Sequence, residues 1–260
     1  MENILNYSIF LLYMLTALSI WWYLSSNESK KIQTTIFILW VLAIILHVYS
    51  LSPIFEDNSV NLSLYYALSV VAFIISFFLY FSSILGNTQY LGIIILPIVS
   101  FVFLLNFTNV PVNISLNNFL FAHVILSLIS YSILCLSAAQ SLILKLQEKK
   151  LQKNKPIGFI GSLPSLDIMD KLLFKLLALG VIFLSLSLLS GLIFLEDIFA
   201  QHLAHKTILS IIAWFIFIYL IFSRSKYGYR GTKAANITLV GFFILFLSYF
   251  GTKTVLEMIL

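Results

Sequence analysis

Long apolar runs constrain the fold of this chain more than any other feature. Each run approaches the roughly 20 residues that a helix needs to cross a bilayer, and none shows the alternation of a barrel strand. Of the 260 residues, 61% are hydrophobic and only 10% are charged, whereas soluble domains carry about 25% charged residues. The sequence therefore predicts an all-α, polytopic membrane helical bundle, because helices satisfy their own backbone hydrogen bonds in lipid.

We expect eight transmembrane helices within a single integral membrane domain, residues 1–260. Their approximate bounds are 6–24, 34–51, 63–85, 90–107, 117–144, 171–195, 206–223 and 234–251. The fourth run is short and contains Pro97. The first run lacks the preceding basic stretch of a signal peptide, so we expect it to be retained as a span. The charged stretch after residue 144 predicts a short amphipathic extension of the fifth helix.

The basic residues indicate how the spans are oriented. All but two of the 15 Lys and Arg residues fall in or beside the first, fifth and seventh loops, the exceptions being Lys206 and Lys253. Short loops rich in Lys and Arg face the cytoplasm. With eight spans, both termini are therefore expected outside, and we expect the protein to be a multi-pass component of a bacterial inner (plasma) membrane.

Composition excludes several functions. The net charge of +5 reflects this loop asymmetry, so we do not expect nucleic acid as a partner. Cys135 is the single cysteine, and neither a CxxC nor a CxxCH motif occurs. The chain therefore has neither a thiol redox pair nor a c-type haem attachment site. No Asp or Glu lies in the middle of a span, which disfavours a proton-driven carrier.

The histidines are the residues that indicate chemistry. His47 lies near the outer end of the second span and His123 lies one or two turns inside the outer end of the fifth. His202 and His205 lie in the outer loop before the seventh span, with His205 at its start. A membrane histidine can simply hydrogen-bond a neighbouring helix, and His202 is most simply read as a solvated loop residue.

Imidazole groups at membrane depth without acidic partners favour haem iron as the metal that these residues bind. A flat apolar macrocycle fits among aliphatic side chains, and two histidines can close its axial positions. A structural zinc site would use four ligands, usually including Cys. We therefore predict a non-covalent haem b held by His123 and by either His205 or His47. Ser127, Ser130 and Tyr131 share the helical face of His123, so this polar stripe is expected to point into the bundle.

Several segments resemble the cytochrome c assembly protein family. They are HKTILSIIAW at 205–214, GYRG at 228–231, SYFG at 248–251 and the His123-containing helix. The resemblance is best from about 119 to 255, and its nearest branch is the HemX/YpjD-like group of inner-membrane proteins. It implies haem handling at the outer face, with His123 in the position of a haem-ligating histidine.

The chain also departs from the haem synthetases of that family. Their Trp-rich signature before the seventh span is replaced by residues 196–205, and the histidine expected near the inner end of that span is replaced by residues 219–221. We therefore expect an accessory haem-binding role rather than catalysis, with a cytochrome biogenesis membrane protein as a partner. Two alternatives remain open: a non-enzymatic accessory to magnesium or cobalt export, and a small-molecule permease.

Overall fold

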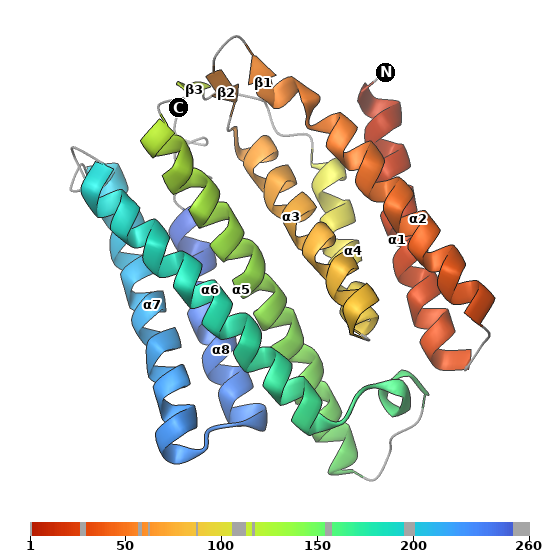
Figure 1. Ribbon diagram of the computed structural model, residues 1–260. Coiled ribbons are helices and arrows are strands. Elements are labelled where there is room, and N and C mark those ends of the chain that lie inside the picture. Colours follow the sequence, from red (N-terminus) through yellow and green to blue (C-terminus); the bar gives the residue numbers. More distant parts are fainter. Residues whose placement is uncertain are drawn as a thin grey trace.

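A computed structural model describes residues 2–26, 30–56, 59–61, 63–86, 88–105, 113–115, 118–153, 158–194 and 201–251. Its helices are α1 (Glu2–Ser26), α2 (Lys30–Ser50), α3 (Leu64–Leu85), α4 (Gly92–Phe101), α5 (Asn118–Leu151), α6 (Leu166–Phe194), α7 (Gln201–Tyr227) and α8 (Gly231–Phe246). Short helical turns are η1 (Ser52–Ile54), η2 (Gln89–Leu91), η3 (Val102–Leu104), η4 (Gly158–Ser162) and the π-helical η5 (Leu247–Gly251). The predicted all-α bundle of apolar helices is confirmed (Figure 1).

The apolar helices lie where the sequence predicted spans. Within the described ranges, seven helices are long and apolar enough to cross a membrane. The fourth predicted span is instead a shorter apolar helix, Gln89–Leu104, with Pro97 inside it and a 3-10 turn at each end. The fifth helix continues past its apolar part to Leu151, as its charged extension predicted. Lys149 and Lys150 lie in its last turn, where cations complement the helix dipole.

Two groups of helices form the bundle, and α3 lies between them (Figure 1). In one group α1 packs on α2 and α4; in the other, α5 packs on α6 and α8, and α7 packs on α6 and α8. Helix α3 contacts α2, α4 and α5. Both groups have fully buried cores, with Tyr13 and Trp40 in the first and Leu134, Leu177 and Phe217 in the second.

A very small antiparallel sheet caps one end of the bundle. Strands β1 (Phe55–Glu56), β2 (Ser59–Asn61) and β3 (Asn113–Ser115) pair in that order. Phe55 faces Val60, and Val60 faces Ile114. Because β1 and β2 follow α2 and β3 precedes α5, the sheet links the two groups of helices at this end.

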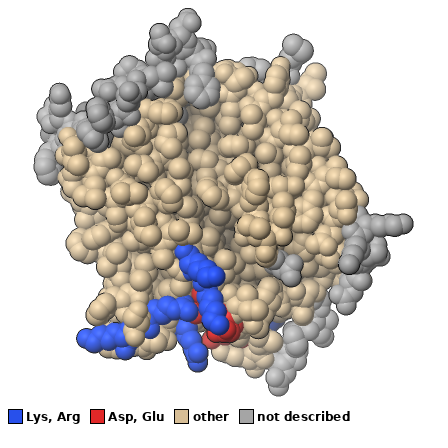
Figure 2. Space-filling view, in the orientation of Figure 1, with Lys and Arg blue, Asp and Glu red and all other residues tan. Residues whose placement is uncertain are grey.

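The charged side chains gather at the other end of the molecule, hereafter the basic end. Figure 2 shows Lys and Arg side chains there on one face of the molecule, beside Asp and Glu side chains. The first residues of α1 and the last turn of α8 lie at the opposite end (Figure 1). The charge asymmetry read from the loops is therefore an asymmetry of the folded bundle, whereas the orientation in a membrane, with both termini outside, stays a prediction.

A tight turn at the basic end joins α7 to α8. Gly228 and Gly231 have φ values of 67° and 62°, a conformation that glycine adopts without steric cost. A Cβ on Gly231 would lie 2.8 Å from an oxygen of Glu148, which accepts hydrogen bonds from the Thr232 amide and hydroxyl. Asp170 accepts from the Gly231 amide at 3.0 Å and pairs with Arg224 at 2.9 Å. These contacts explain the GYRG segment as a structural element that fastens α7 and α8 to α5 and α6.

Candidate functional site

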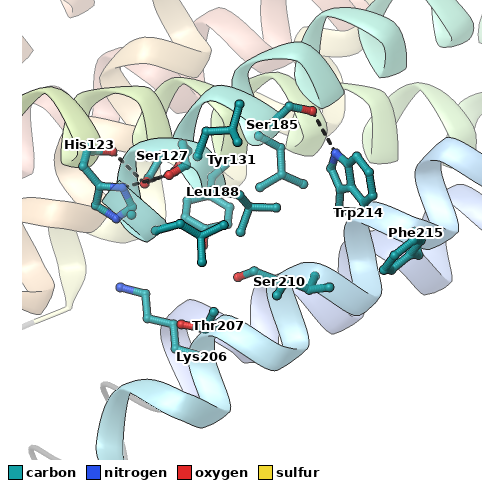
Figure 3. Close-up of a pocket in the computed structure, with 16 residues that line it drawn as sticks. His123, Ser127, Tyr131, Ser185, Leu188, Lys206, Thr207, Ser210, Trp214 and Phe215 are labelled. Carbon is teal, nitrogen blue, oxygen red and sulfur yellow. Dashed lines mark hydrogen bonds between the residues drawn. The ribbon is translucent and has the colours of Figure 1, made fainter. Parts of the chain in front are cut away.

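A cavity of about 340 Å³ lies between α5, α6 and α7, in the half of the bundle away from the basic end. Its walls come from the first turns of α5, the last turns of α6 and the first half of α7 (Figure 3). Leucine, isoleucine and aromatic side chains make up most of the lining, with a few polar groups among them. Sites for small molecules and cofactors have this character and begin at about 300 Å³.

His123 stands at the edge of this cavity and is held by α6 (Figure 3). Its Nδ1 lies 2.9 Å from the carbonyl oxygen of Ser187 and 3.0 Å from the hydroxyl of Ser190. Because a carbonyl only accepts, we assign the ring proton to Nδ1, which leaves the lone pair on Nε2. No described residue hydrogen-bonds Nε2. A backbone carbonyl orients many metal-binding histidines in this way, and the Nε2 lone pair of His123 is therefore available to a ligand in the cavity.

The polar stripe of α5 faces the interior, as its helical spacing predicted. Ser127 donates to the His123 carbonyl at 2.8 Å and lies 2.6 Å from the Ser187 hydroxyl. Tyr131 is buried and lines the cavity. Ser130 donates to the Gly180 carbonyl of α6 at 3.1 Å and therefore acts between the helices. The stripe thus combines helix packing at Ser130 with cavity lining at Ser127 and Tyr131.

Helix α7 supplies polar groups that the sequence reasoning did not assign to a site. Lys206 and Ser210 line the cavity, and the Ser210 hydroxyl lies 2.7 Å from that of Ser248. Trp214 also lines it and donates from Nε1 to the Ser185 hydroxyl at 2.8 Å. The sequence signal that could have identified this wall of the cavity is the segment 205–214, which carries part of the family resemblance.

The other two outer histidines lie at the start of α7. The backbone of His202 and His205 is helical, whereas their side chains lie outside the described residues. His205 directly precedes Lys206, which lines the cavity. The chain therefore brings the position of His205 next to the cavity wall, and its role as a ligand stays a prediction.

His47 occupies a different environment from His123. It is fully buried between α1 and α3, and its ring contacts Phe73 and Phe103 edge-on. Its Nε2 lies 3.1 Å from the Ser69 carbonyl, which assigns the proton to Nε2, and its Nδ1 lies 3.0 Å from the Tyr13 hydroxyl. Both ring nitrogens are thus engaged, and His47 does not line the cavity. The role of His47 as a haem ligand also stays a prediction.

The residues that the structure describes contain no group of three or more His, Cys, Asp or Glu side chains able to hold a metal ion. The cavity instead offers a single described histidine with a free lone pair, apolar walls and scattered hydroxyls. A metal bound in this cavity would need most of its ligands from outside these described residues. This donor set fits haem, whose porphyrin supplies four ligands and leaves axial positions for histidine.

Comparison with known proteins bears on the whole chain. The family model described as "Cytochrome C assembly protein" matches residues 4–260. The chain is 34% identical over 137 residues to the "Inner membrane protein YpjD" of Escherichia coli (strain K12), covering 53% of this chain and 52% of that protein. It is 27% identical over 145 residues to the "Cytochrome c biogenesis protein CcsA" of Chlamydomonas reinhardtii, covering 54% of this chain and 39% of that protein. The chain thus spans about half the length of the curated relatives it matches.

Proposed function

This chain belongs to the cytochrome C assembly protein family, and from that premise we propose that it is a haem-binding membrane protein that serves cytochrome c biogenesis in an accessory role. The cavity between α5, α6 and α7 would hold a b-type haem without a covalent bond. His123 would supply one axial ligand through Nε2. When bound, haem would supply the iron chemistry, while the chain binds and orients it.

One observation carries this proposal: the hydrogen bond from Nδ1 of His123 to the Ser187 carbonyl. It fixes the ring orientation and leaves the Nε2 lone pair for a metal. The bond connects residues 64 positions apart, so it depends on the close packing of α5 against α6. The apolar walls around it would exclude water from the bound macrocycle.

The second axial ligand would be His205, with His47 as the alternative. His205 is favoured because Lys206, its neighbour, already lines the cavity. For His47 to bind iron, one of its two hydrogen bonds, to Tyr13 or to Ser69, would have to break. An unpaired buried polar group costs about 1–3 kcal/mol, so binding of iron by His47 would carry a penalty of this size.

Cellular context follows from the family and from the relatives. The chain is a multi-pass membrane protein, and we propose the bacterial inner membrane as its location, as the name of the Escherichia coli relative states for that protein. Its partner would be a membrane protein of cytochrome biogenesis. Holding or passing haem to that partner would need no covalent step by this chain.

The test is an absorption spectrum of the detergent-purified protein, oxidised and then reduced, before and after addition of haem. We expect a sharp bis-histidine b-type spectrum in the wild type and its loss in His123→Ala. Exogenous imidazole should restore the spectrum of His123→Ala, because it supplies the missing ligand to an otherwise intact cavity. The spectra of His205→Ala and His47→Ala identify the second ligand, because the variant that lacks this ligand should lose the bis-histidine spectrum. His202→Ala is the matched control and should keep the wild-type spectrum.

A featureless spectrum that haem cannot change would overturn the proposal. So would a His123→Ala protein that binds haem with an unaltered spectrum. In either case the resemblance would be one of fold, and cobalt or magnesium tolerance of a deletion strain would become the next measurement.

A further inference from the structure

The turn between α7 and α8, at the basic end of the molecule (Figure 1), carries cations that no described acid balances. Residues 223–233 contain four Lys or Arg residues and neither Asp nor Glu. Lys226, Arg230 and Lys233 are exposed, and none of the three forms an ion pair with another described residue. The turn therefore presents three positive charges at the surface.

The acids that the structure describes at this end are engaged elsewhere. Asp170 pairs with Arg224 at 2.9 Å, and Asp167 pairs with Lys171 at 2.6 Å, one turn along α6. Glu148 accepts two hydrogen bonds from the start of α8. These carboxylates offset other cations or hold the backbone, so the three cations of the turn are available to an anion from outside the chain.

Two of these cations lie beside tyrosine rings of the same turn. The Nζ atom of Lys233 lies 3.6 Å from the centroid of the Tyr229 ring, and that of Lys226 lies 5.5 Å from the centroid of the Tyr227 ring. The centroids of the two tyrosine rings are 6.0 Å apart, so both ammonium groups belong to one cluster. Because neighbouring rings already position these side chains, an anion bound here would order them at a reduced entropic cost.

An exposed aromatic face of α7 leads to this cluster. Phe215, Tyr219 and Phe222 are between 51% and 59% exposed. Their spacing of four and three residues, with Lys226 four residues later, places all four side chains on one side of the helix. The Lys226 ammonium lies 5.7 Å from the centroid of the Phe222 ring. This surface is complementary to a molecule with an anionic head and an apolar tail.

We propose that the α7–α8 turn binds the phosphate of an anionic phospholipid, whose acyl chains lie along the aromatic face of α7. Basic clusters at the ends of membrane helices attract anionic headgroups, and tyrosine at a span end marks the level of those headgroups. A soluble phosphate would contact the cations but leave the aromatic face uncovered, so the surface fits a lipid better. This inference does not depend on haem.

The test measures the affinity of the detergent-purified protein for dioleoyl phosphatidylglycerol and for dioleoyl phosphatidylcholine by native mass spectrometry. We expect wild type to prefer the anionic lipid by about tenfold. The preference should be lost in a triple variant that removes the three cations of the turn: Lys226→Gln, Arg230→Gln and Lys233→Gln. It should persist in a matched control that removes three exposed cations at the end of α5: Lys149→Gln, Lys150→Gln and Lys153→Gln.

The comparison of two lipids also checks folding, because a triple variant that binds phosphatidylcholine as wild type does has kept its lipid-facing surface. Lys226→Gln alone changes one exposed residue and should lower the preference about threefold. Inorganic phosphate should not displace phosphatidylglycerol beyond the effect of chloride at the same ionic strength.

Three results would overturn the inference. The first is an equal preference for phosphatidylglycerol in wild type and in the variants of the turn. The second is an equal loss of preference in the α5 control, which would show a general effect of net charge. The third is specific displacement of the lipid by inorganic phosphate, which would show a site for the soluble anion.

Discussion

The two histidines whose side chains the structure describes, His47 and His123, differ in what their hydrogen bonds leave free. At His47, Tyr13 and Ser69 engage both ring nitrogens, and the side chain is fully buried. At His123, the contacts to α6 engage only Nδ1, and Nε2 stands beside a cavity. The same residue type therefore serves as a cross-link between helices in one place and has the geometry of a ligand in the other.

Replacing Tyr13 by Phe tests the cross-link. The substitution leaves Nδ1 of His47 buried without its 3.0 Å hydrogen bond. We expect the free energy of unfolding to fall by about 1 kcal/mol, because side-chain hydrogen bonds between membrane helices contribute about 0.6–2 kcal/mol. Equilibrium denaturation of the detergent-solubilised protein measures it. Tyr7→Phe on the exposed face of α1 is the control, and a Tyr13→Phe protein as stable as that control would contradict the prediction.

At the scale of elements, the pairing of α5 with α6 builds the site. Ser130 bonds the Gly180 carbonyl, and a Cβ on Gly180 would lie 2.6 Å from Leu134, which is fully buried. Small residues let membrane helices approach this closely. Ser187 and Gly191, two small residues four positions apart, lie farther along α6. Both residues line the cavity, and the Ser187 carbonyl holds His123.

Gly180→Ala is expected to separate these two helices. The added methyl group forces Leu134 or the backbone to move, and overpacking of this kind costs about 1–3 kcal/mol. The same shift should weaken the His123–Ser187 contact and so reduce haem affinity. Denaturation and haem titration measure the two effects. Gly86→Ala is the matched control, because the nearest atom to its added Cβ is 4.0 Å away; equal behaviour of the two variants would refute this account of the packing.

At the scale of the whole molecule, the bundle has a basic end and an end that carries the cavity and the small sheet. A basic residue at this end also stabilises the fold, since Arg224 pairs with Asp170. Asp170 in turn accepts a hydrogen bond from the turn before α8. The cavity lies in the other half, and its described lining comes from α5, α6 and α7. If the basic end faces the cytoplasm, as its Lys and Arg content favours, the cavity lies near the outer leaflet.

This orientation is testable with single cysteines in a Cys135→Ala background. Asn3→Cys lies at the start of α1, and Lys153→Cys lies just after α5 at the basic end. A membrane-impermeant maleimide added to intact bacterial spheroplasts should label Asn3→Cys and leave Lys153→Cys unlabelled. After lysis, both should react, which controls for accessibility of each thiol. The reverse pattern in intact spheroplasts would show that both the termini and the cavity face the cytoplasm.

Local properties of the sequence were enough to predict the class of the protein. Apolar length indicated helices that cross a membrane, because lipid admits no unsatisfied backbone. The fourth predicted span was less accurate: the structure has only a short helix at Gln89–Leu104, and Pro97 removes a backbone donor inside it. The polar stripe of α5 was predicted to face inward from its spacing alone. The family followed from short segments, and the match over residues 4–260 confirms it.

Only the tertiary structure decided which residues meet. Sequence spacing gives the face of a helix on which His123 lies, but its hydrogen-bond partner is 64 positions away on another helix. The same limit applies to Lys206 and Trp214, because only the packing of α7 against α6 places them in the lining of the cavity. The packing also separates His47 from His123, although both lie near outer helix ends in the sequence. Periodicity and charge are properties of a segment, whereas a site is a property of how segments pack, and that packing is fixed by shape and by contacts far apart in the chain.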